Sequence, residues 1–272
     1  MSDETTPAKL TLGGLLKGKR ALVTGIANDR SIAWAIAEAF KAEGAELAFT
    51  YPGPAMGERV IPLVQTLGPV AVLDMDVSSD DSIEAAFRDL GKVWDRFDIL
   101  VHSIGYAPRE ALGGRFTDVT SREAWRITLD VSAYSLIALT RAARPFMKQG
   151  GNVVTLSYYG AEKVVSNYNV MGVAKAALES SARYLAEDLG RDGIRVNAVS
   201  AGPVKTLAAA GIKGMRAMLQ ENADKTPLRR NIVQDDVARA CLYLCSDLAR
   251  SVTGEVLHVD CGQNIVGVVS MG

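Results

Sequence analysis

The sequence predicts an α/β fold: a single doubly wound domain with a seven-stranded parallel sheet and helices on both faces. Three observations predict it. Nearly continuous apolar segments, which suit strands buried on both faces, alternate with segments whose apolar residues recur at helical spacing. Such alternation calls for parallel strands joined by helical crossovers. No linker or internal repeat interrupts it over the 272 residues, which indicates one domain.

The first half of the chain contains four predicted strands with three predicted helices between them. The first strand leads into a glycine turn at Gly25, and the third ends in Asp76. Ser79 or Asp80 is the expected N-cap of the third helix, because short polar side chains satisfy the first backbone N–H groups of a helix. The strands are expected at residues 20–26, 46–51, 70–77 and 98–105, and the helices at 32–43, within 56–67, and at 80–94.

The second half continues the pattern to the seventh strand. A loop with Pro108 and two glycines leads into a long predicted helix, and the remaining strands and helices alternate after it. The helices are expected at residues 121–147, up to about 189, and near 235–245, and the strands at 152–157, 194–200 and 256–259.

The domain is expected to span residues 16–272, with a flexible segment before it and a lid within it. Residues 1–15 are interpreted as a flexible N-terminal segment. Residues 203–227 are rich in small and apolar side chains, which is typical of a mobile lid over a hydrophobic ligand. A surface helix packed on the core explains the same composition, and the sequence leaves both readings open.

The composition is that of an ordinary globular protein and excludes several classes of function. Hydrophobic residues make up 48% and charged residues 22%, and the formal net charge is −1, which gives no sign of a nucleic-acid-binding surface. The first ten residues carry acids and no apolar core, unlike a signal peptide. No uncharged apolar run is as long as a membrane span, so we expect no membrane partner.

The cysteines and histidines predict no metal site. Three cysteines cannot all pair internally, so we expect buried free thiols and a reducing, cytoplasmic location. The two histidines, His102 and His258, form no ligand cluster with them in the sequence. His102 lies inside a predicted strand and is interpreted as a packed histidine.

Candidate ligand-binding residues fall where the predicted strands end. In a doubly wound sheet, ligands bind in the crevice at the carboxyl ends of the strands. Residues at or just beyond five of these ends are Gly25, Asp76, Gly105, Tyr158 and Gly202. Their convergence predicts a single ligand crevice.

The segment from Thr155 to Ala176 carries the residues best suited to catalysis. Tyr168 and Lys175 are seven residues apart in what we interpret as a helix, so both project from one face, about 10 Å apart along its axis. A positive charge strengthens a phenol's hydrogen bond to a developing oxyanion. Tyr158, at the strand-to-helix corner, provides a second phenol. A packed ring and a solvated lysine stem are the alternative.

Two further segments suit a dinucleotide. The turn at residues 25–32 lacks the G-x-G-x-x-G pattern, but free backbone N–H groups and the Ser31 hydroxyl at a helix N-terminus suit a pyrophosphate. An ordinary turn with a serine cap is equally consistent. The Asp76 carboxylate and the Val77 backbone N–H suit hydrogen bonds to the edge of an adenine ring. A helix-capping role explains Asp76 equally well.

At these residues the chain resembles the short-chain dehydrogenases/reductases, and within them the bacterial enoyl-acyl-carrier-protein reductases. The resemblance spans residues 16–265. It is carried by G-x-x-x-x-x-S-I at residues 25–32, H-S-I-G at 102–105, Y-x6-K at 168–175 and S-A-G-P-V-K-T-L-A at 200–208. Most members of the superfamily carry Y-x3-K, whereas Met171 stands four residues before Lys175 here. The six-residue spacing favours the enoyl reductase branch.

The resemblance implies a Rossmann-type fold and an enzyme that reduces trans-2-enoyl thioesters on acyl carrier protein. The implied catalytic residues are Tyr158, Tyr168 and Lys175, with substrate contacts at Ala107, Tyr158 and Tyr168. It also implies a homotetramer built on the helices after the fourth and fifth strands. The implied cofactor contacts are Gly25, Ile26, Ala27, Ser31, Ile32, Asp76, Val77, Ser103, Ile104, Gly105, Lys175, Val204, Lys205, Thr206, Leu207 and Ala208.

Desolvation predicts NADH over NADPH. The second strand ends in A-F-T-Y-P-G-P, residues 48–54, which offers neither an acid for a ribose hydroxyl nor a base for a 2′-phosphate. Placing a phosphate beside Tyr51 and two prolines without a cation is costly. Arg59, the nearest base, adjoins Glu58 beyond the turn. A neutral hydroxyl needs only a backbone partner.

Two rival functions and one docking surface complete the predictions. A carbonyl reductase of the same fold is disfavoured by Met171, and a non-catalytic dinucleotide-sensing module by the joint presence of both tyrosines and the lysine. Residues 203–230 carry six basic and two acidic side chains. This excess of positive charge suits docking of an acidic acyl carrier protein at the lid. The alternative is that the charges only keep an exposed lid soluble.

Overall fold

Seven parallel strands form one sheet within residues 13–204 and 215–267, which the computed structural model describes. Their order is β3-β2-β1-β4-β5-β6-β7, so the chain runs outward from β1 to β3 and then returns to β4. The predicted fold class is confirmed. The strands are β1 (Arg20–Val23), β2 (Glu46–Tyr51), β3 (Ala71–Asp74), β4 (Ile99–His102), β5 (Gly151–Tyr158), β6 (Ile194–Ala201) and β7 (Val256–Val259).

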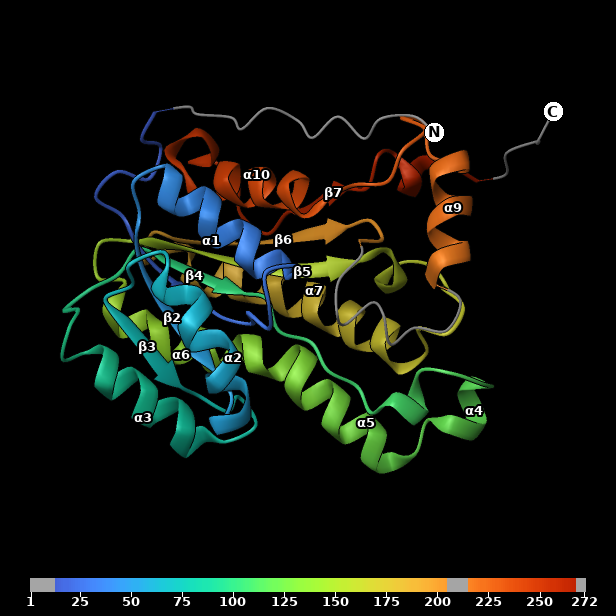
Figure 1. Cartoon of the computed structure of the whole chain (residues 1–272), viewed down its shortest axis with the longest axis horizontal. Helices are drawn as coiled ribbons and strands as arrows, with labels where there is room; N and C mark the ends of the chain where they lie inside the picture. Colours follow the sequence, from blue (N-terminus) through green and yellow to red (C-terminus); the bar gives the residue numbers. More distant parts are fainter. Residues whose placement is uncertain (1–12, 205–214, 268–272) are drawn as a thin grey trace.

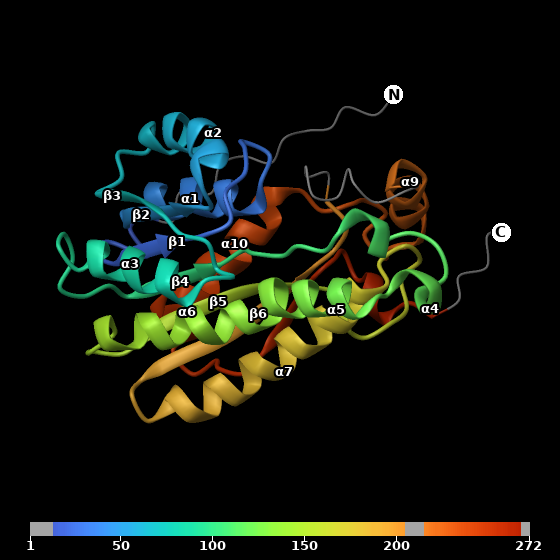
Figure 2. The ribbon, with the colours of Figure 1, turned by 90° about the horizontal axis from the view of Figure 1, so that it is seen from below.

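Helices cover both faces of the sheet, as Figure 1 shows. Helices α1, α2 and α10 pack over one apolar core, and α3, α6 and α7 over the other. Figure 2 shows α7 alongside α5 and α6, which it contacts. The helices are α1 (Ile32–Ala42), α2 (Pro54–Gln65), α3 (Asp80–Leu90), α4 (Phe116–Val119), α5 (Arg122–Leu129), α6 (Ser135–Ala143), α7 (Val170–Gly190), α9 (Met215–Lys225) and α10 (Gln234–Cys245).

The reversal between β1 and β4 creates the switch point of the sheet. These two strands are direct neighbours, with Leu22 paired to Leu100. Helices on opposite faces diverge there, which leaves room at the carboxyl ends of the strands for a ligand.

The third strand ends earlier than predicted. Its last residue is Asp74, so Asp76 lies two residues beyond the sheet. The Asp76 backbone N–H donates to Ser82 Oγ at 2.9 Å, which turns the chain toward α3 instead of along the sheet. Of the two N-caps predicted for α3, Ser79 and Asp80, the structure has Ser79. Its Oγ accepts from the backbone N–H of Ser82 at 3.2 Å.

The long helix predicted at residues 121–147 is confirmed in extent, since residues 122–146 are helical without a break, but it is not α-helical throughout. A π-helical segment at Asp130–Tyr134 separates α5 from α6. In this segment Ser132 Oγ accepts from the backbone N–H of Tyr106 and donates to its carbonyl oxygen, at 2.8 and 2.9 Å. These bonds to the loop after β4 anchor the segment, and π-bulges of this kind are frequent at functional sites.

Residues just before β1 are bound to the domain, and its thiols are buried. Before β1, the backbone N–H groups of Gly14 and Leu15 donate to the Glu43 carboxylate at 2.7 and 2.9 Å, so these two residues are held by the domain. As expected, the three cysteines are free and buried. None of the helices in the described ranges combines the length and apolar character that a membrane span requires.

Candidate active site

Two tyrosine rings meet at the carboxyl end of β5. Tyr158 is the last residue of that strand, and its ring and the Tyr168 ring meet in a T-shaped contact, with 4.9 Å between centroids and 74° between planes. Tyr168 is buried. The hydroxyl oxygen of Tyr158 is also buried and has no hydrogen-bond partner among the described residues. A buried polar atom without a partner is costly, so it indicates a place for a ligand oxygen.

The prediction that Tyr168 and Lys175 share a helix face is wrong. Helix α7 begins at Val170, so Tyr168 lies in the turn before it, between Asn167 and Asn169, whose φ angles are positive at 61° and 41°. The turn allows the ring to pack on Gly160, where an added Cβ would lie 2.5 Å from Tyr168 Cδ1. Tyr168 is therefore positioned by contact with the residues after β5.

Lys175 lies buried on the first turns of α7. Its Nζ donates to the carbonyl oxygen of Leu156 at 2.7 Å, which ties α7 to the end of β5. A Cβ at Gly105 would lie 3.5 Å from Nζ, so the ammonium also reaches the backbone that follows β4. Burial lowers the pKa of Lys175 to about 8, although the Glu179 carboxylate opposes the shift.

Burial also determines the state of the phenols. It raises the pKa of Tyr158 to about 12 and raises the pKa of Tyr168 as well. Both tyrosines are therefore O–H donors throughout the neutral range. This site offers two donors and one ammonium group, which together suit an oxygen atom on which negative charge develops.

His102 is a packed histidine, as predicted. Its Nδ1 and Nε2 each lie 2.8 Å from a hydroxyl oxygen, of Thr155 and Ser135 respectively. Complete burial and the nearby Lys175 charge lower the pKa of His102 to about 3, so the ring is neutral and links β4 to β5 and α6.

The ends of β1 and β4 approach each other at the switch point. Gly25 has a φ of +86°, and an added Cβ would lie 1.9 Å from the carbonyl oxygen of Ser103. Only glycine fits this backbone junction. In the turn between β1 and α1, the backbone N–H groups were predicted to be free for a pyrophosphate. Those of Ala27 and Asn28 are not free, because both donate to Ser31 Oγ at 3.0 Å. The N-terminus of α1 remains for an anion.

The other predicted cofactor residues differ in their surroundings. Ile26 and Val204 are buried core residues, whereas Ile32, Val77 and Ile104 are half-buried on the two cores. The Asp76 carboxylate is exposed and accepts from the backbone N–H and hydroxyl of Ser78, so it caps a local turn. The predicted contacts Lys205, Thr206, Leu207 and Ala208 lie outside the described residues.

The predicted substrate contact Ala107 lies among small apolar residues. It packs against a buried cluster of Ala111, Ala124 and Val170, beside the turn that carries Tyr168. The lid expected at residues 203–227 is described only in part. In α9, Leu219 and Asn222 are buried, and Asn231 donates to the Leu219 carbonyl oxygen at 2.9 Å, so this helix is packed on the residues that follow it.

Three residues near the site were not predicted. Ser132 positions the loop after β4, Glu179 accepts from Ser157 beside Lys175, and Asp74 reaches the loop after β2. The spacing of Lys175 and Glu179, one helical turn apart, is a signal that the sequence did contain. Nothing local in the sequence distinguishes the other two.

The fold and the site together define the class of short-chain dehydrogenases and reductases. Residues 25–264 match the family model described as Enoyl-(Acyl carrier protein) reductase. The enoyl-[acyl-carrier-protein] reductase [NADH] of Aquifex aeolicus is 53% identical over 256 residues, covering 94% of this chain and 94% of that protein. The chain belongs to the enoyl-(acyl carrier protein) reductase family.

Solved structures agree with this assignment. The enzyme of Anaplasma phagocytophilum, in complex with NAD, is 45% identical with a TM-score of 0.90 and covers 97% of this chain and 98% of that one. The enzyme of Bacillus cereus, with NADP+ and an indole naphthyridinone, is 46% identical with a TM-score of 0.92 and covers 94% and 100%.

Proposed function

We propose that this chain reduces trans-2-enoyl thioesters on acyl carrier protein with NADH, and that Tyr158, Tyr168 and Lys175 are its catalytic residues. The observation that carries the proposal is the pair of protonated phenols in edge contact at the end of β5, one of them with an unpartnered hydroxyl. The buried ammonium group of Lys175 is bound to the same strand end, at the carbonyl oxygen of Leu156. Reduction of a conjugated thioester places negative charge on its carbonyl oxygen, and these groups stabilise such a charge.

The described residues fit the dinucleotide. The junction of Gly25 with Ser103 leaves bare backbone at the switch point, and the N-terminus of α1 follows it, where the helix dipole favours a pyrophosphate. When bound, NADH supplies the hydride for the β-carbon of the substrate. Lys175 holds the nicotinamide ribose from α7, and Ser103, Ile104 and Gly105 line the same side.

Each catalytic residue has a separate role. Tyr168 donates its O–H to the thioester oxygen and stabilises the charge that appears there in the transition state. Tyr158 offers a second O–H to the same region. Lys175, held at the carbonyl oxygen of Leu156 near the end of β5, supplies a positive charge on the β4 side of the site. Ala107, with its apolar neighbours, forms one wall of the acyl slot.

The activity is tested by following the absorbance of NADH with a crotonyl thioester and, separately, with simple ketones. We expect oxidation of NADH with the thioester alone. Reduction of ketones at a comparable rate would instead identify a carbonyl reductase. Tight NADH binding without turnover of either substrate would identify a dinucleotide-sensing module.

The acyl carrier protein is expected to dock near the lid, in the cytoplasm. Within residues 203–230, Lys225 and Arg230 form ion pairs with Glu221 and Asp236, so their charges are partly neutralised. The side chains of Lys213 and Arg216 lie outside the described residues. The docking surface is therefore a proposal that rests on the basic excess of the sequence.

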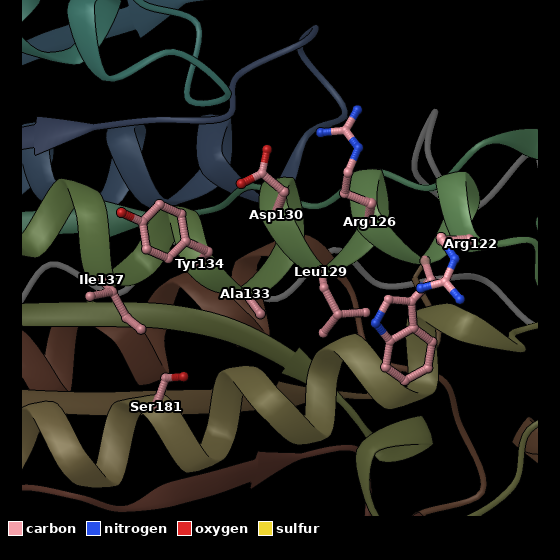
Figure 3. Close-up of a pocket in the computed structure, with 9 residues that line it drawn as sticks. Arg122, Arg126, Leu129, Asp130, Ala133, Tyr134, Ile137 and Ser181 are labelled. Atoms are coloured by element: carbon pink, nitrogen blue, oxygen red, sulfur yellow. The ribbon is translucent and has the colours of Figure 1, made fainter.

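We also infer a homotetramer in which α5, α6 and α7 contact a second copy. Trp125 on α5, Tyr134 in the π-helical segment and Tyr184 on α7 are exposed by 44%, 38% and 78%. Trp125 and Tyr134 line an open pocket of about 650 Å³ together with Ser181 of α7. Figure 3 shows Leu129 of α5, Ala133 of the π-helical segment and Ser181 of α7 around this pocket. Exposed aromatic surface of this kind favours a protein partner.

A further inference from the structure

A carboxylate at the end of β3 reaches the loop that follows β2. Asp74 is the last residue of β3 and pairs in register with Tyr51, the last residue of β2. Its Oδ1 accepts from the backbone N–H of Gly53 at 2.7 Å. The carboxylate is therefore held beside the carboxyl end of β2, although it belongs to the neighbouring strand.

The loop that Asp74 contacts is fixed on both sides. Gly53 has a φ of +73°, which favours glycine, and Pro54 begins α2 immediately after it. The Tyr51 ring packs so closely on α2 that a Cβ at Gly57 would lie 2.7 Å from it. Because both ends of the loop are anchored, the Asp74 carboxylate has a defined place relative to β2.

The charge of Asp74 is available to a ligand. The side chain is exposed, and no lysine or arginine in the described ranges forms an ion pair with it. Its second oxygen, Oδ2, accepts no hydrogen bond from those residues. The N–H of Gly53, in contrast, is occupied, so it does not serve as the backbone partner that the sequence suggested for a ribose hydroxyl.

In dinucleotide-binding sheets of this type, the adenosine ribose lies at the end of the second strand, and an acid there accepts a hydrogen bond from its 2′-hydroxyl. Residues 51–54 contain no acid. We propose that Asp74 performs this function from β3: Oδ2 accepts from the 2′-hydroxyl of NADH, and the negative charge repels the 2′-phosphate of NADPH. The proposal rests on the dinucleotide binding proposed above.

The choice between the two cofactors is a property of individual chains. One solved relative contains NAD and another NADP+, and both share the fold of this chain. Residues at the ribose therefore decide the preference. The strand pairing of Tyr51 with Asp74 explains why the sequence alone did not identify this residue: 23 positions separate them along the chain, and only the register brings them together.

The experiment measures binding of ADP-ribose and 2′-phospho-ADP-ribose to the full chain by calorimetry. In Asp74→Asn the amide oxygen still accepts from Gly53, so the loop is kept. The uncharged amide nitrogen replaces Oδ2 and donates to the 2′-hydroxyl, which can accept as well as donate, so the negative charge is lost but a hydrogen bond remains. We expect the affinity for the phosphorylated ligand to rise about tenfold, and that for ADP-ribose to change less than about threefold. The gain should shrink at high salt, because exposed charges are screened.

Two comparisons make the outcome decisive. Glu58→Gln removes another exposed carboxylate from the start of α2 and should leave the ratio of affinities unchanged. An unchanged ratio in Asp74→Asn, or an equal change in Glu58→Gln, overturns the assignment of Asp74. A wild-type chain that binds neither ligand overturns the proposed dinucleotide binding itself, and the role of Asp74 with it.

Discussion

At Tyr158, Tyr168 and Lys175 the three titratable groups lose their protons in a defined order. Burial raises the pKa of both phenols, that of Tyr158 to about 12, and lowers that of Lys175 to about 8. As the pH rises, the ammonium group therefore deprotonates first, and the phenols remain donors. Among these three residues, Lys175 is therefore the one whose charge changes with pH near neutrality.

Replacement of Tyr168 tests the main oxyanion donor. We expect Tyr168→Phe to lower kcat for a crotonyl thioester on the order of 10²-fold, because one donor to the developing charge is lost. The dissociation constant of NADH should stay within about threefold, since the phenyl ring still packs on Gly160. Tyr243→Phe, on α10, is the control and should be silent. A normal kcat in Tyr168→Phe would exclude this tyrosine from the mechanism.

Glu179 should shift the pH dependence through Lys175. The two residues are one turn apart on α7, and the Glu179 carboxylate, which accepts from Ser157, raises the pKa of Lys175 against the effect of burial. In Glu179→Gln this support is lost, so the pKa of Lys175 falls further. The alkaline limb of kcat/KM for NADH, expected near pH 8 in the wild type, should move to lower pH.

Other charged or titratable groups lie near Lys175 and Glu179, and the control variant must leave them unchanged. His102 is neutral, and Glu162, Arg183 and His258 act on Glu179 and remain in the variant. Glu187→Gln changes an exposed carboxylate two turns further along α7 and should leave the limb in place. A limb that stays near pH 8 in Glu179→Gln would show that Glu179 does not support the charge of Lys175.

At the scale of elements, apolar periodicity predicted every strand and most helices, and failed where tertiary contacts override it. The π segment is invisible to periodicity, because it is anchored by Ser132 to the backbone of Tyr106, 26 positions earlier. The start of α7 was placed too early for the same reason. Tyr168 continues the helical pattern, but its ring is held by Gly160 in the turn before the helix.

The β1–α1 turn offers a test of one such element. Gly25→Ala adds strain at a positive φ and places a Cβ on the carbonyl oxygen of Ser103, so the turn must move. We expect the free energy of unfolding to fall by roughly 1–3 kcal/mol and NADH affinity to fall at least about tenfold. Denaturant titration and calorimetry measure the two effects.

Gly18→Ala separates strain from position. Gly18 has a similar φ of +77°, but an added Cβ meets nothing within 4 Å. This variant should lose about 1 kcal/mol of stability and bind NADH normally. If Gly25→Ala also bound NADH normally, the backbone junction of β1 and β4 would not belong to the cofactor site.

Across the whole molecule, the sequence predicted the sheet and the region of the site, because apolar alternation and strand ends are local signals. The contacts that give the site its chemistry are not local. Tyr158 and Tyr168 meet through the packing of a turn, and Asp74 meets Gly53 through the register of β2 and β3. Burial, which determines the pKa of Lys175, depends on the entire fold.

The exposed aromatic face of α5, α6 and α7 has consequences for the whole molecule. Trp125 lies on α5 and Tyr184 on the neighbouring α7, which also carries Lys175. An isolated chain would leave this apolar surface in water. Burial of such surface against a second copy is favourable by about 25 cal/mol per Å² and would also stiffen α7, which positions Lys175.

Trp125→Asp tests this assembly. A charge in the centre of the face should be costly to bury, whereas a half-exposed side chain tolerates it in the isolated chain. Four copies of the 29.0-kDa chain have a mass of about 116 kDa, and sedimentation velocity should detect this mass in the wild type and smaller species in Trp125→Asp. Val93→Asp, at a site 50% exposed before β4, is the control and should remain a tetramer. A wild type of 29 kDa, or an unchanged mass in Trp125→Asp, would place the assembly surface elsewhere or exclude it.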